Sequence, residues 1–303
     1  MRIIKTIIKI VKGIINMPVT IMQVKNSMVR VESKLDFIIQ YLHESNSTKS
    51  TIHHVEQDRL RTCEDGIILK IEEYLAKELS SLTVTFNQKF ENQFIQLESL
   101  SSLYNSLPNL KFLPATRGWA GSPDFLAKIS ELILKGKPNC VLEAGSGLST
   151  IIIGSALRLN NNGKLISLEH DRFYANITKE NLDINGISQI ADVKYCPLKD
   201  YTDFDQSWKW YDNENLNLIN KIDMLVIDGP PGATQLLARY PAVLLLHEHF
   251  SDRTLILLDD ANRTDESIIV QKWVTFLESN NFNVVVTQYN NFEKGLVILE
   301  VLR

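Results

Sequence analysis

The sequence predicts an α/β fold, in which a mostly parallel β-sheet with an antiparallel last strand follows a long α-helical region. From Pro138 onward, short apolar runs alternate with amphipathic stretches of helical length, which is typical of buried parallel strands covered by helices. The end of the chain differs, because two strand-like runs, 282–288 and 295–302, are separated by six mostly polar residues and indicate a hairpin. Before residue 111, apolar residues instead recur every three or four positions, as they do along one stripe of a helix.

Composition and charge exclude several classes of protein. Hydrophobic residues make up 44% of the 303 residues and charged residues 22%, which excludes a collagen-like, wholly disordered or disulfide-scaffold protein. The formal net charge of −4 hides an asymmetry: residues 1–31 contain six bases and no acid, whereas residues 111–303 contain 19 bases and 24 acids. The acidic second half, which lacks an Asn/Asp-Pro-Pro-Tyr/Trp motif, argues against nucleic acid as a partner. The three cysteines form no CxxC pair, so a reducing, cytoplasmic location is the simplest expectation.

Residues 1–17 are expected to form an amphipathic helix. Arg2, Lys5, Lys9 and Lys12 fall on one stripe of a helix, and isoleucines cover the opposite side. Such a helix suits the surface of an anionic membrane, which predicts a peripheral position on the inner membrane face. The same helix could equally dock on another protein. It is too often interrupted by lysine to span a membrane.

Residues 18–110 are expected to form a helical coiled-coil spacer. From Ile21 to Leu42 apolar residues alternate at spacings of three and four, and a second apolar series runs from Ile68 to Leu107. This heptad-like spacing is typical of coiled coils, so we expect a homo-oligomer that assembles through this region. Pro108 is expected to end the second helix.

The strands of the sheet are predicted from apolar runs between residues 140 and 302. In chain order they are Cys140–Ala144, Leu165–Glu169, a weaker run Asp192–Cys196, Asp223–Ile227, Leu255–Leu258, and the two strands of the terminal hairpin.

Four of these strands end in polar residues, at the edge of the sheet where open α/β folds bind ligands. The first ends in Glu143 and runs into a loop with glycines at 145 and 147, which let the backbone approach a ligand closely. The second ends in Glu169, which lies 22 residues after Gly147, the spacing expected of an acid that binds ribose hydroxyls. The other two end in Asp228-Gly229-Pro230-Pro231-Gly232 and in Asp259-Asp260-Ala261-Asn262. The sequence therefore predicts a site for a nucleoside-containing cofactor.

These motifs resemble those of class I S-adenosylmethionine-dependent methyltransferases, and specifically a bacterial subgroup with a GSGLST loop and a DGPPG strand end. The resemblance covers residues 117–300 and is carried by RGWAGSPD (117–124), VLEAGSGLST (141–150), SLEHD (167–171), VIDGPPG (226–232) and LLDDANR (257–263). It implies a Rossmann-like, seven-stranded sheet with an antiparallel last strand, formed by a methyltransferase domain at residues 111–303.

The resemblance also implies how the cofactor S-adenosylmethionine is bound. Glu143 and the loop of Gly145, Ser146 and Gly147 would line its methionine part. Glu169 would bind both ribose hydroxyls, and His170 would orient the adenosine. Leu198, just after the third strand, would lie beside the adenine, and Asp228 would face the sulfonium and the acceptor.

The motifs suggest several candidate residues for the part of the site that meets the methyl acceptor. Asp228, Asp260 and His170 are candidate catalytic residues, because an acceptor hydroxyl needs a base to remove its proton. Asp228, Asp260 and Asn262 are similar to the Asp/Asp/Asn set that holds magnesium in catechol O-methyltransferase-like enzymes, although Ala261 here displaces the Asn by one position. Helix capping and strand-end solvation are alternative roles for these acids.

Arg117 and Trp119 are candidate contacts of the acceptor. An arginine suits an anionic or carboxylate-bearing group, whereas the tryptophan also suits a packing role at the domain junction. The acceptor predicted is a hydroxyl of a sugar, a glycan or another small metabolite. A glycan under assembly at the membrane would explain an anchor and a spacer together.

Two other functions fit parts of the sequence. One is an NAD-dependent oxidoreductase on a Rossmann sheet, although the glycine loop lacks the third spaced glycine. The other is a non-catalytic coiled-coil scaffold that carries a degenerate methyltransferase domain. The intact acids and glycines at the strand ends argue against such decay.

Overall fold

The structure is a computed structural model, and it describes residues 54–116, 118, 120–202, 207–212 and 221–303. The predicted membrane-surface helix (1–17), the first apolar series of the spacer, Arg117 and Trp119 lie outside the described residues. The chain divides into two compact units, residues 1–90 and 91–303. Within the part of the chain that the structure describes, no helix is both long enough and apolar enough to cross a membrane.

Helix α3 runs from His54 to Ser106 and ends immediately before Leu107-Pro108, as predicted. Leu103 in its last turn and Leu107 just after its end are buried in the core of the second unit. Other large apolar side chains of α3 are exposed, and a coiled coil through them stays a prediction. These are Tyr74, Leu79, Val84, Phe86, Phe90, Phe94, Ile95, Leu97 and Tyr104.

The second unit is built around a seven-stranded sheet with strand order β3-β2-β1-β6-β7-β9-β8. The strands are β1 (Cys140–Ala144), β2 (Lys164–Glu169), β3 (Ala191–Tyr195), β6 (Ile222–Ile227), β7 (Phe250–Asp259), β8 (Asn283–Tyr289) and β9 (Leu296–Leu302). The first five are parallel to one another, whereas β9 is antiparallel to both of its neighbours, β7 and β8. The α/β fold with an antiparallel last strand is therefore confirmed.

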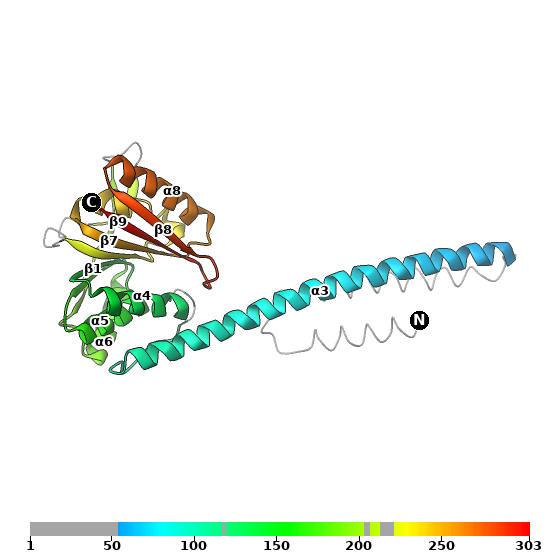
Figure 1. Cartoon of the computed structure of the whole chain (residues 1–303), viewed down its shortest axis with the longest axis horizontal. Coiled ribbons are helices and arrows are strands. Elements are labelled where there is room, and N and C mark those ends of the chain that lie inside the picture. The colour runs from blue at the N-terminus through cyan, green and yellow to red at the C-terminus, as the bar shows by residue number, and fades with distance from the viewer. Residues whose placement is uncertain (1–53, 117, 119, 203–206, 213–220) are drawn as a thin grey trace. The chain divides into compact units, whose positions relative to one another are not determined.

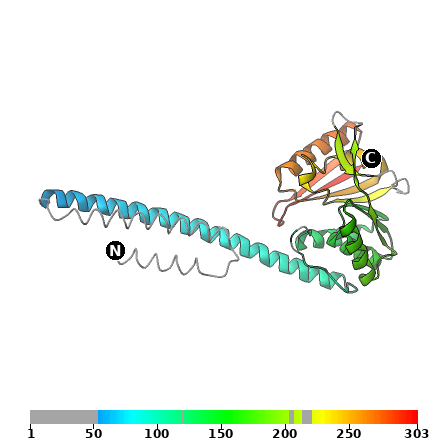
Figure 2. The same ribbon diagram turned by 180° about the vertical axis from the view of Figure 1, so that it is seen from behind.

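Helices cover both faces of this sheet, as Figures 1 and 2 show. On one side lie α4 (Pro123–Gly136), α5 (Leu148–Asn160) and α6 (Arg172–Asn185), and on the other lie α7 (Pro241–Leu246) and α8 (Thr264–Ser279). Successive strand residues face the two layers in turn: Val141 and Val226 pack on the α5 side, and Leu142 and Leu225 on the α8 side. Both faces are thus buried, which explains why the strands are continuous apolar runs.

The sequence did not predict the two-stranded ribbon of β4 (Leu198–Tyr201) and β5 (Trp208–Tyr211), inserted between β3 and β6. Trp210 and Tyr211 are fully buried and pack with residues of α7 and α8. The ribbon therefore belongs to the α8 side of the sheet (Figure 2).

Strand β7 is longer than the predicted run Leu255–Leu258. The first half of β7 contains polar residues. One of them, Arg253, lies at the surface and pairs with Glu300 of β9 at 2.5 Å. Thr254, although polar, is buried and donates its hydroxyl to the Ile222 carbonyl at 2.7 Å. The strand therefore begins earlier than its apolar residues predict, because polar residues with partners on other segments also belong to it.

Candidate active site

The carboxyl ends of β1 and β6 touch at the point where the chain order of the sheet reverses. The Ala144 carbonyl accepts hydrogen bonds from the N–H groups of both Asp228 and Gly229, at 3.0 and 2.7 Å. Gly145 has a φ of +98°, and a Cβ added there would lie 2.9 Å from the Gly229 nitrogen. Only glycine combines this φ with so close an approach of two backbones. The predicted loop therefore begins at the switch point of the sheet, where α/β folds bind their ligands.

Glu169, at the end of β2, is held from several sides. One of its oxygens accepts both the backbone N–H and the hydroxyl of Ser146, each at 3.0 Å. The other accepts the Asp171 N–H at 2.9 Å and lies 3.1 Å from Nδ1 of His170. Burial opposes ionisation, but the hydrogen bonds from His170, Asp171 and Ser146 outweigh it and hold the pKa of Glu169 below its ordinary value. The hydrogen bond with Glu169 in turn raises the pKa of His170.

Glu143 is fully buried below the glycine loop. The Thr150 hydroxyl donates to it at 2.6 Å, and the Gly147 N–H donates to that hydroxyl at 2.9 Å. Burial raises the pKa of Glu143 to about 7, although hydroxyl groups of Ser149, Ser167 and Thr150 favour its ionised form. This carboxyl group therefore organises the loop from beneath and titrates near neutral pH.

Tyr211 is a residue of this site that sequence reasoning missed. Its side chain is fully buried, and its hydroxyl has no hydrogen-bond partner among the described residues. The hydroxyl lies against Gly229, where an added Cβ would overlap it, and the ring meets His170 edge-on with centroids 6.0 Å apart. Burial, together with the charges of Glu169 and Asp228, raises the pKa of Tyr211 well above its ordinary value, so the phenol keeps its proton. A buried donor without a partner is unusual and suits contact with a bound ligand.

Arg239, which precedes α7, lies among the acids at the ends of β6 and β7. It is 2% exposed. Its Nη2 donates to Asp260 at 2.7 Å, to the Asp228 carbonyl at 2.5 Å and to the Asp228 carboxylate at 3.3 Å, and its Nη1 donates to the Asp259 carbonyl at 2.8 Å. Burial raises the pKa of Asp228, and the nearby guanidinium of Arg239 opposes that rise.

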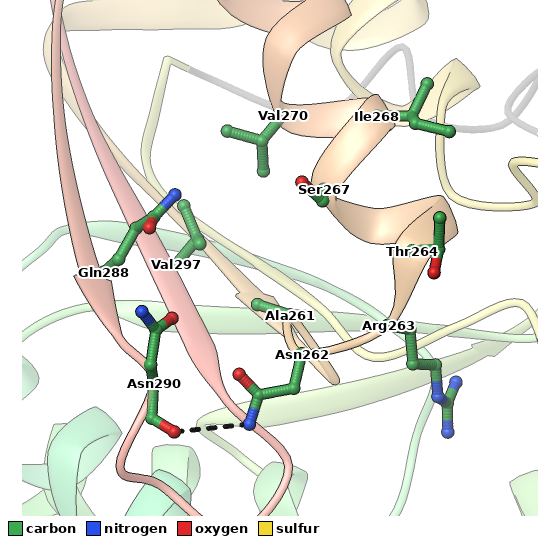
Figure 3. Close-up of a pocket in the computed structure, with 10 residues that line it drawn as sticks. All are labelled: Ala261, Asn262, Arg263, Thr264, Ser267, Ile268, Val270, Gln288, Asn290 and Val297. Carbon is green, nitrogen blue, oxygen red and sulfur yellow. Dashed lines mark hydrogen bonds between the residues drawn. The ribbon is translucent and has the colours of Figure 1, made fainter.

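Asp228 and Asp260 of the predicted magnesium set lie together, with Asp259 beside them, whereas Asn262 contacts the β8–β9 loop. Among the described residues, the acidic oxygens that cluster are those of Asp228, Asp259 and Asp260, which lie within 4.8 Å of one another. The Asn262 side-chain amide donates to the Asn290 carbonyl at 3.4 Å (Figure 3). The physical reason is the turn at Asp260, where a left-handed φ of +58° directs Ala261 and Asn262 toward the β8–β9 loop.

The remaining predicted residues lie at the margins of this site. Leu198 is half-buried at the start of β4 and packs against the core on the α8 side. Next to the undescribed Arg117 and Trp119, the Ala120 carbonyl accepts a hydrogen bond from Nζ of Lys294 at 2.8 Å. The segment that enters the domain is thereby tied to the β8–β9 loop.

A groove of about 400 Å³ lies beside the end of β7, between the first turns of α8 and the β8–β9 hairpin (Figure 3). Its lining is mainly polar. The polar side chains are those of Asn262, Arg263, Thr264, Ser267, Gln288 and Asn290. The groove thus presents amide and hydroxyl groups next to Asp260.

The middle of the second unit matches a known family. Residues 142–261 match the family model described as a methyltransferase domain. This range contains all four polar strand ends, with Glu143, Glu169, Asp228 and Asp260. No curated protein was found to match the chain.

Solved structures with a similar fold include several methyltransferases. A putative O-methyltransferase from Klebsiella pneumoniae is 18% identical and has a TM-score of 0.45, over 67% of this chain and 90% of that chain. An O-methyltransferase from Bacillus cereus, solved in complex with SAH, is 16% identical with a TM-score of 0.48, over 70% of this chain and 96% of that chain. The O-methyltransferase TomG from Streptomyces achromogenes, solved in complex with SAM, is 14% identical with a TM-score of 0.45, over 68% and 90%.

Proposed function

We propose that this protein is an S-adenosylmethionine-dependent methyltransferase that methylates a hydroxyl group of a sugar, a glycan or another small metabolite. The observation that carries the proposal is the cradle at the ends of β1 and β2, where Ser146 joins the glycine loop to Glu169. The match of residues 142–261 to a methyltransferase domain supports it independently of the geometry.

In this proposal different residues bind different parts of the cofactor. Glu169 binds the ribose hydroxyls, since its oxygens already accept hydrogen bonds and its pKa is held low, which keeps it ionised. The backbone of Gly145, Ser146 and Gly147 receives the methionine part, and Leu198 supports the adenine. The bound cofactor supplies an activated methyl group, so the protein has mainly to position the two partners.

The proton of the acceptor hydroxyl goes to Asp228 in this proposal. Its side chain is 18% exposed, compared with 5% for Asp260, so Asp228 is better placed to meet an acceptor. Burial raises its pKa toward that of a useful base. His170 is bonded to Glu169, which suits orientation of the adenosine better than proton removal.

The polar groove beside Asp260 is the proposed acceptor site. Amide and hydroxyl side chains recognise hydroxyl groups by both donating and accepting hydrogen bonds, which favours a sugar over an apolar acceptor. Arg117 and Trp119 are proposed to complete this site.

The helical region, residues 1–110, is proposed to set location and assembly. The exposed apolar residues of α3 support a coiled coil between copies of the chain. The basic residues 1–17 support contact with an anionic membrane surface on the cytoplasmic side.

Calorimetric titration of the full-length protein with S-adenosylmethionine, S-adenosylhomocysteine and NAD tests the cofactor directly. We expect both sulfur compounds to bind at one site per chain and NAD to give no heat of binding. Binding of NAD alone would favour the oxidoreductase, and binding of none of the three would favour the scaffold. Transfer of labelled methyl groups to glycan and metabolite extracts then identifies the acceptor class.

A further inference from the structure

We propose that the Arg239 guanidinium is the resident cation of the acidic cluster at the ends of β6 and β7, and that this cluster works without a divalent metal ion. The role of Arg239 in methyl transfer rests on the proposed function. Its role as the cation of the cluster rests on its own contacts.

The Arg239 guanidinium already supplies a positive charge to the two acids predicted as metal ligands. A single nitrogen, Nη2, lies 2.7 Å from Asp260 and 3.3 Å from the Asp228 carboxylate, so it already bridges the two acids predicted as metal ligands. Magnesium binds carboxylate oxygens at about 2.1 Å. An ion on the same Asp260 oxygen would therefore lie within about 5 Å of this nitrogen, where two cations repel each other strongly.

The remaining contacts of Arg239 fix the guanidinium in this position. Nη1 donates to the Asp259 carbonyl, Nη2 also donates to the Asp228 carbonyl, and Glu266 lies 3.7 Å from Nη1. A planar group with several fixed donors suits such a set of oxygens arranged around it. Since two of these oxygens are backbone carbonyls at the ends of adjacent strands, the guanidinium ties β6 to β7.

The chain next to Arg239 is also anchored. The Tyr240 carbonyl accepts a hydrogen bond from the indole N–H of Trp273 at 2.7 Å, and Trp273 is fully buried in the core under α8. The backbone on the carboxyl side of Arg239 is thus held against the core. Arg239 is therefore a fixed, buried member of the cluster.

Four acids and two guanidinium groups make up this cluster, in which the buried Asp259 carboxyl lies beside Asp228 and Asp260. Asp228, Asp260 and Glu266 surround Arg239, and Arg263 adds a second guanidinium 2.9 Å from Asp260. The side-chain amide N–H of Asn262, the third residue of the predicted metal set, donates to the Asn290 carbonyl. The residues present therefore do not fit the magnesium set that the motif suggested, and they fit an internal arginine.

In methyl transfer Arg239 acts as a positioning residue. Its hydrogen bonds to the carbonyl and the carboxylate of Asp228 hold that side chain in one orientation. Its positive charge also stabilises the carboxylate form that accepts a proton.

Cation titrations of the full-length protein test the inference. Mn²⁺ binding is followed by electron paramagnetic resonance and Mg²⁺ binding by calorimetry. For the wild type we expect no stoichiometric site and a thermal midpoint that is the same in Mg²⁺ and in a chelator. Arg239→Ala is expected to gain one Mn²⁺ site and a midpoint that rises with Mn²⁺, because its carboxylates have lost their cation. Arg253→Ala, which removes an exposed arginine, is the matched control and should gain no site.

The outcomes separate the inference from a merely structural role for Arg239. A stoichiometric Mn²⁺ site in the wild type that disappears in Asp260→Asn would overturn the proposal, as would a folded Arg239→Ala variant that gains no site. If Arg239→Ala does not fold, the wild-type titration still decides, and Arg239→Lys serves as the second variant. Arg239→Lys keeps the positive charge and should bind no Mn²⁺.

The methyl-transfer measurement is kept separate. With S-adenosylmethionine and an extract, transfer by the wild type should be unchanged by a chelator. Loss of transfer in the chelator would contradict the inference. Failure to bind S-adenosylmethionine at all would contradict the proposed function instead and would leave the Mn²⁺ result standing.

Discussion

Ser146 donates both its backbone N–H and its hydroxyl to the same oxygen of Glu169, at 3.0 Å each. This pair of hydrogen bonds joins the loop after β1 to the end of β2, so the two parts of the cofactor site are held at a set spacing before any ligand binds. A preorganised carboxylate of this kind binds hydroxyl groups with less loss of conformational freedom.

Removing the Glu169 carboxylate should weaken cofactor binding. Glu169→Ala is expected to lower the affinity for S-adenosylmethionine by about 10- to 100-fold, because two charge-assisted hydrogen bonds to the ribose are lost. Calorimetry measures the change. Glu180→Ala, at an exposed position of α6, is the control and should bind as the wild type does. An unchanged affinity in Glu169→Ala would show that the cofactor site is misassigned.

The contact between Gly145 and Gly229 should tolerate no side chain. Gly145→Ala adds a Cβ 2.9 Å from the Gly229 nitrogen at a φ of +98°. We expect the free energy of unfolding to fall by about 2 kcal/mol or more, from strain and overlap together. Gly136→Ala, in α4, has no atom within 4 Å of the new methyl group and should be neutral or slightly stabilising. Urea denaturation of the two variants makes the comparison, and equal effects would contradict the close approach.

Glu143 should make stability and binding depend on pH near neutrality. Its pKa is raised from 4.5 to about 7 in the folded protein, so the folded state binds the extra proton between these values. The resulting stability is complete below pH 4.5 and is lost as the pH rises to about 7, by at most about 3 kcal/mol. Denaturation of the wild type and of Glu143→Gln across this range measures the difference, which should vanish in the variant.

The same titration should appear in cofactor binding. An ionised Glu143 favours the positively charged methyl donor, so the affinity should increase as the pH rises through about 7. In Glu143→Gln the affinity should be independent of pH in this range. A wild-type affinity that is flat from pH 6 to pH 8, about one unit on either side of the titration, would be inconsistent with this role.

The Tyr211 hydroxyl should contribute more to ligand affinity than to the stability of the fold. Because its buried hydroxyl has no partner among the described residues, Tyr211→Phe is expected to be neutral or to stabilise the free protein by about 1 kcal/mol. It should nevertheless weaken binding of the cofactor or the acceptor. Tyr201→Phe is the matched control: its hydroxyl donates to the Tyr211 carbonyl at 3.1 Å, and its loss should cost about 1 kcal/mol without changing affinity. Thermal unfolding and calorimetry on both variants distinguish these effects.

The exposed apolar side chains of α3 should mediate self-association. Leu79 and Leu97 are 51% and 64% exposed, and placing a charge at both should weaken a coiled coil. We expect Leu79→Glu with Leu97→Glu to lower the oligomeric state in analytical ultracentrifugation and to leave the thermal midpoint of the sheet unit unchanged. Ser101→Glu, also exposed, should leave assembly as it is. A wild type that is monomeric at all concentrations would refute the predicted coiled coil.

The inner strands of the sheet could be predicted because they are buried on both faces. Such strands need apolar residues at consecutive positions, so runs like those of β1 and β6 are visible without any tertiary information. The β4–β5 ribbon could not be predicted in this way. Its burial comes from packing on α7 and α8, and its pattern of tryptophan, lysine and tyrosine has no period of its own.

The residues of the site likewise fall into those that the sequence could predict and those that it could not. The polar strand ends can be recognised from the sequence alone, since Glu143, Glu169, Asp228 and the pair Asp259-Asp260 each follow an apolar run. Tertiary structure decided which groups meet there, because hydrogen bonds and ion pairs form between residues that no local pattern connects. Arg239 reaches acids on two different strands, and Tyr211 arrives from an inserted ribbon. Spacing along a chain predicts the edge where a site lies, whereas the charges and donors that fill it depend on how distant segments pack.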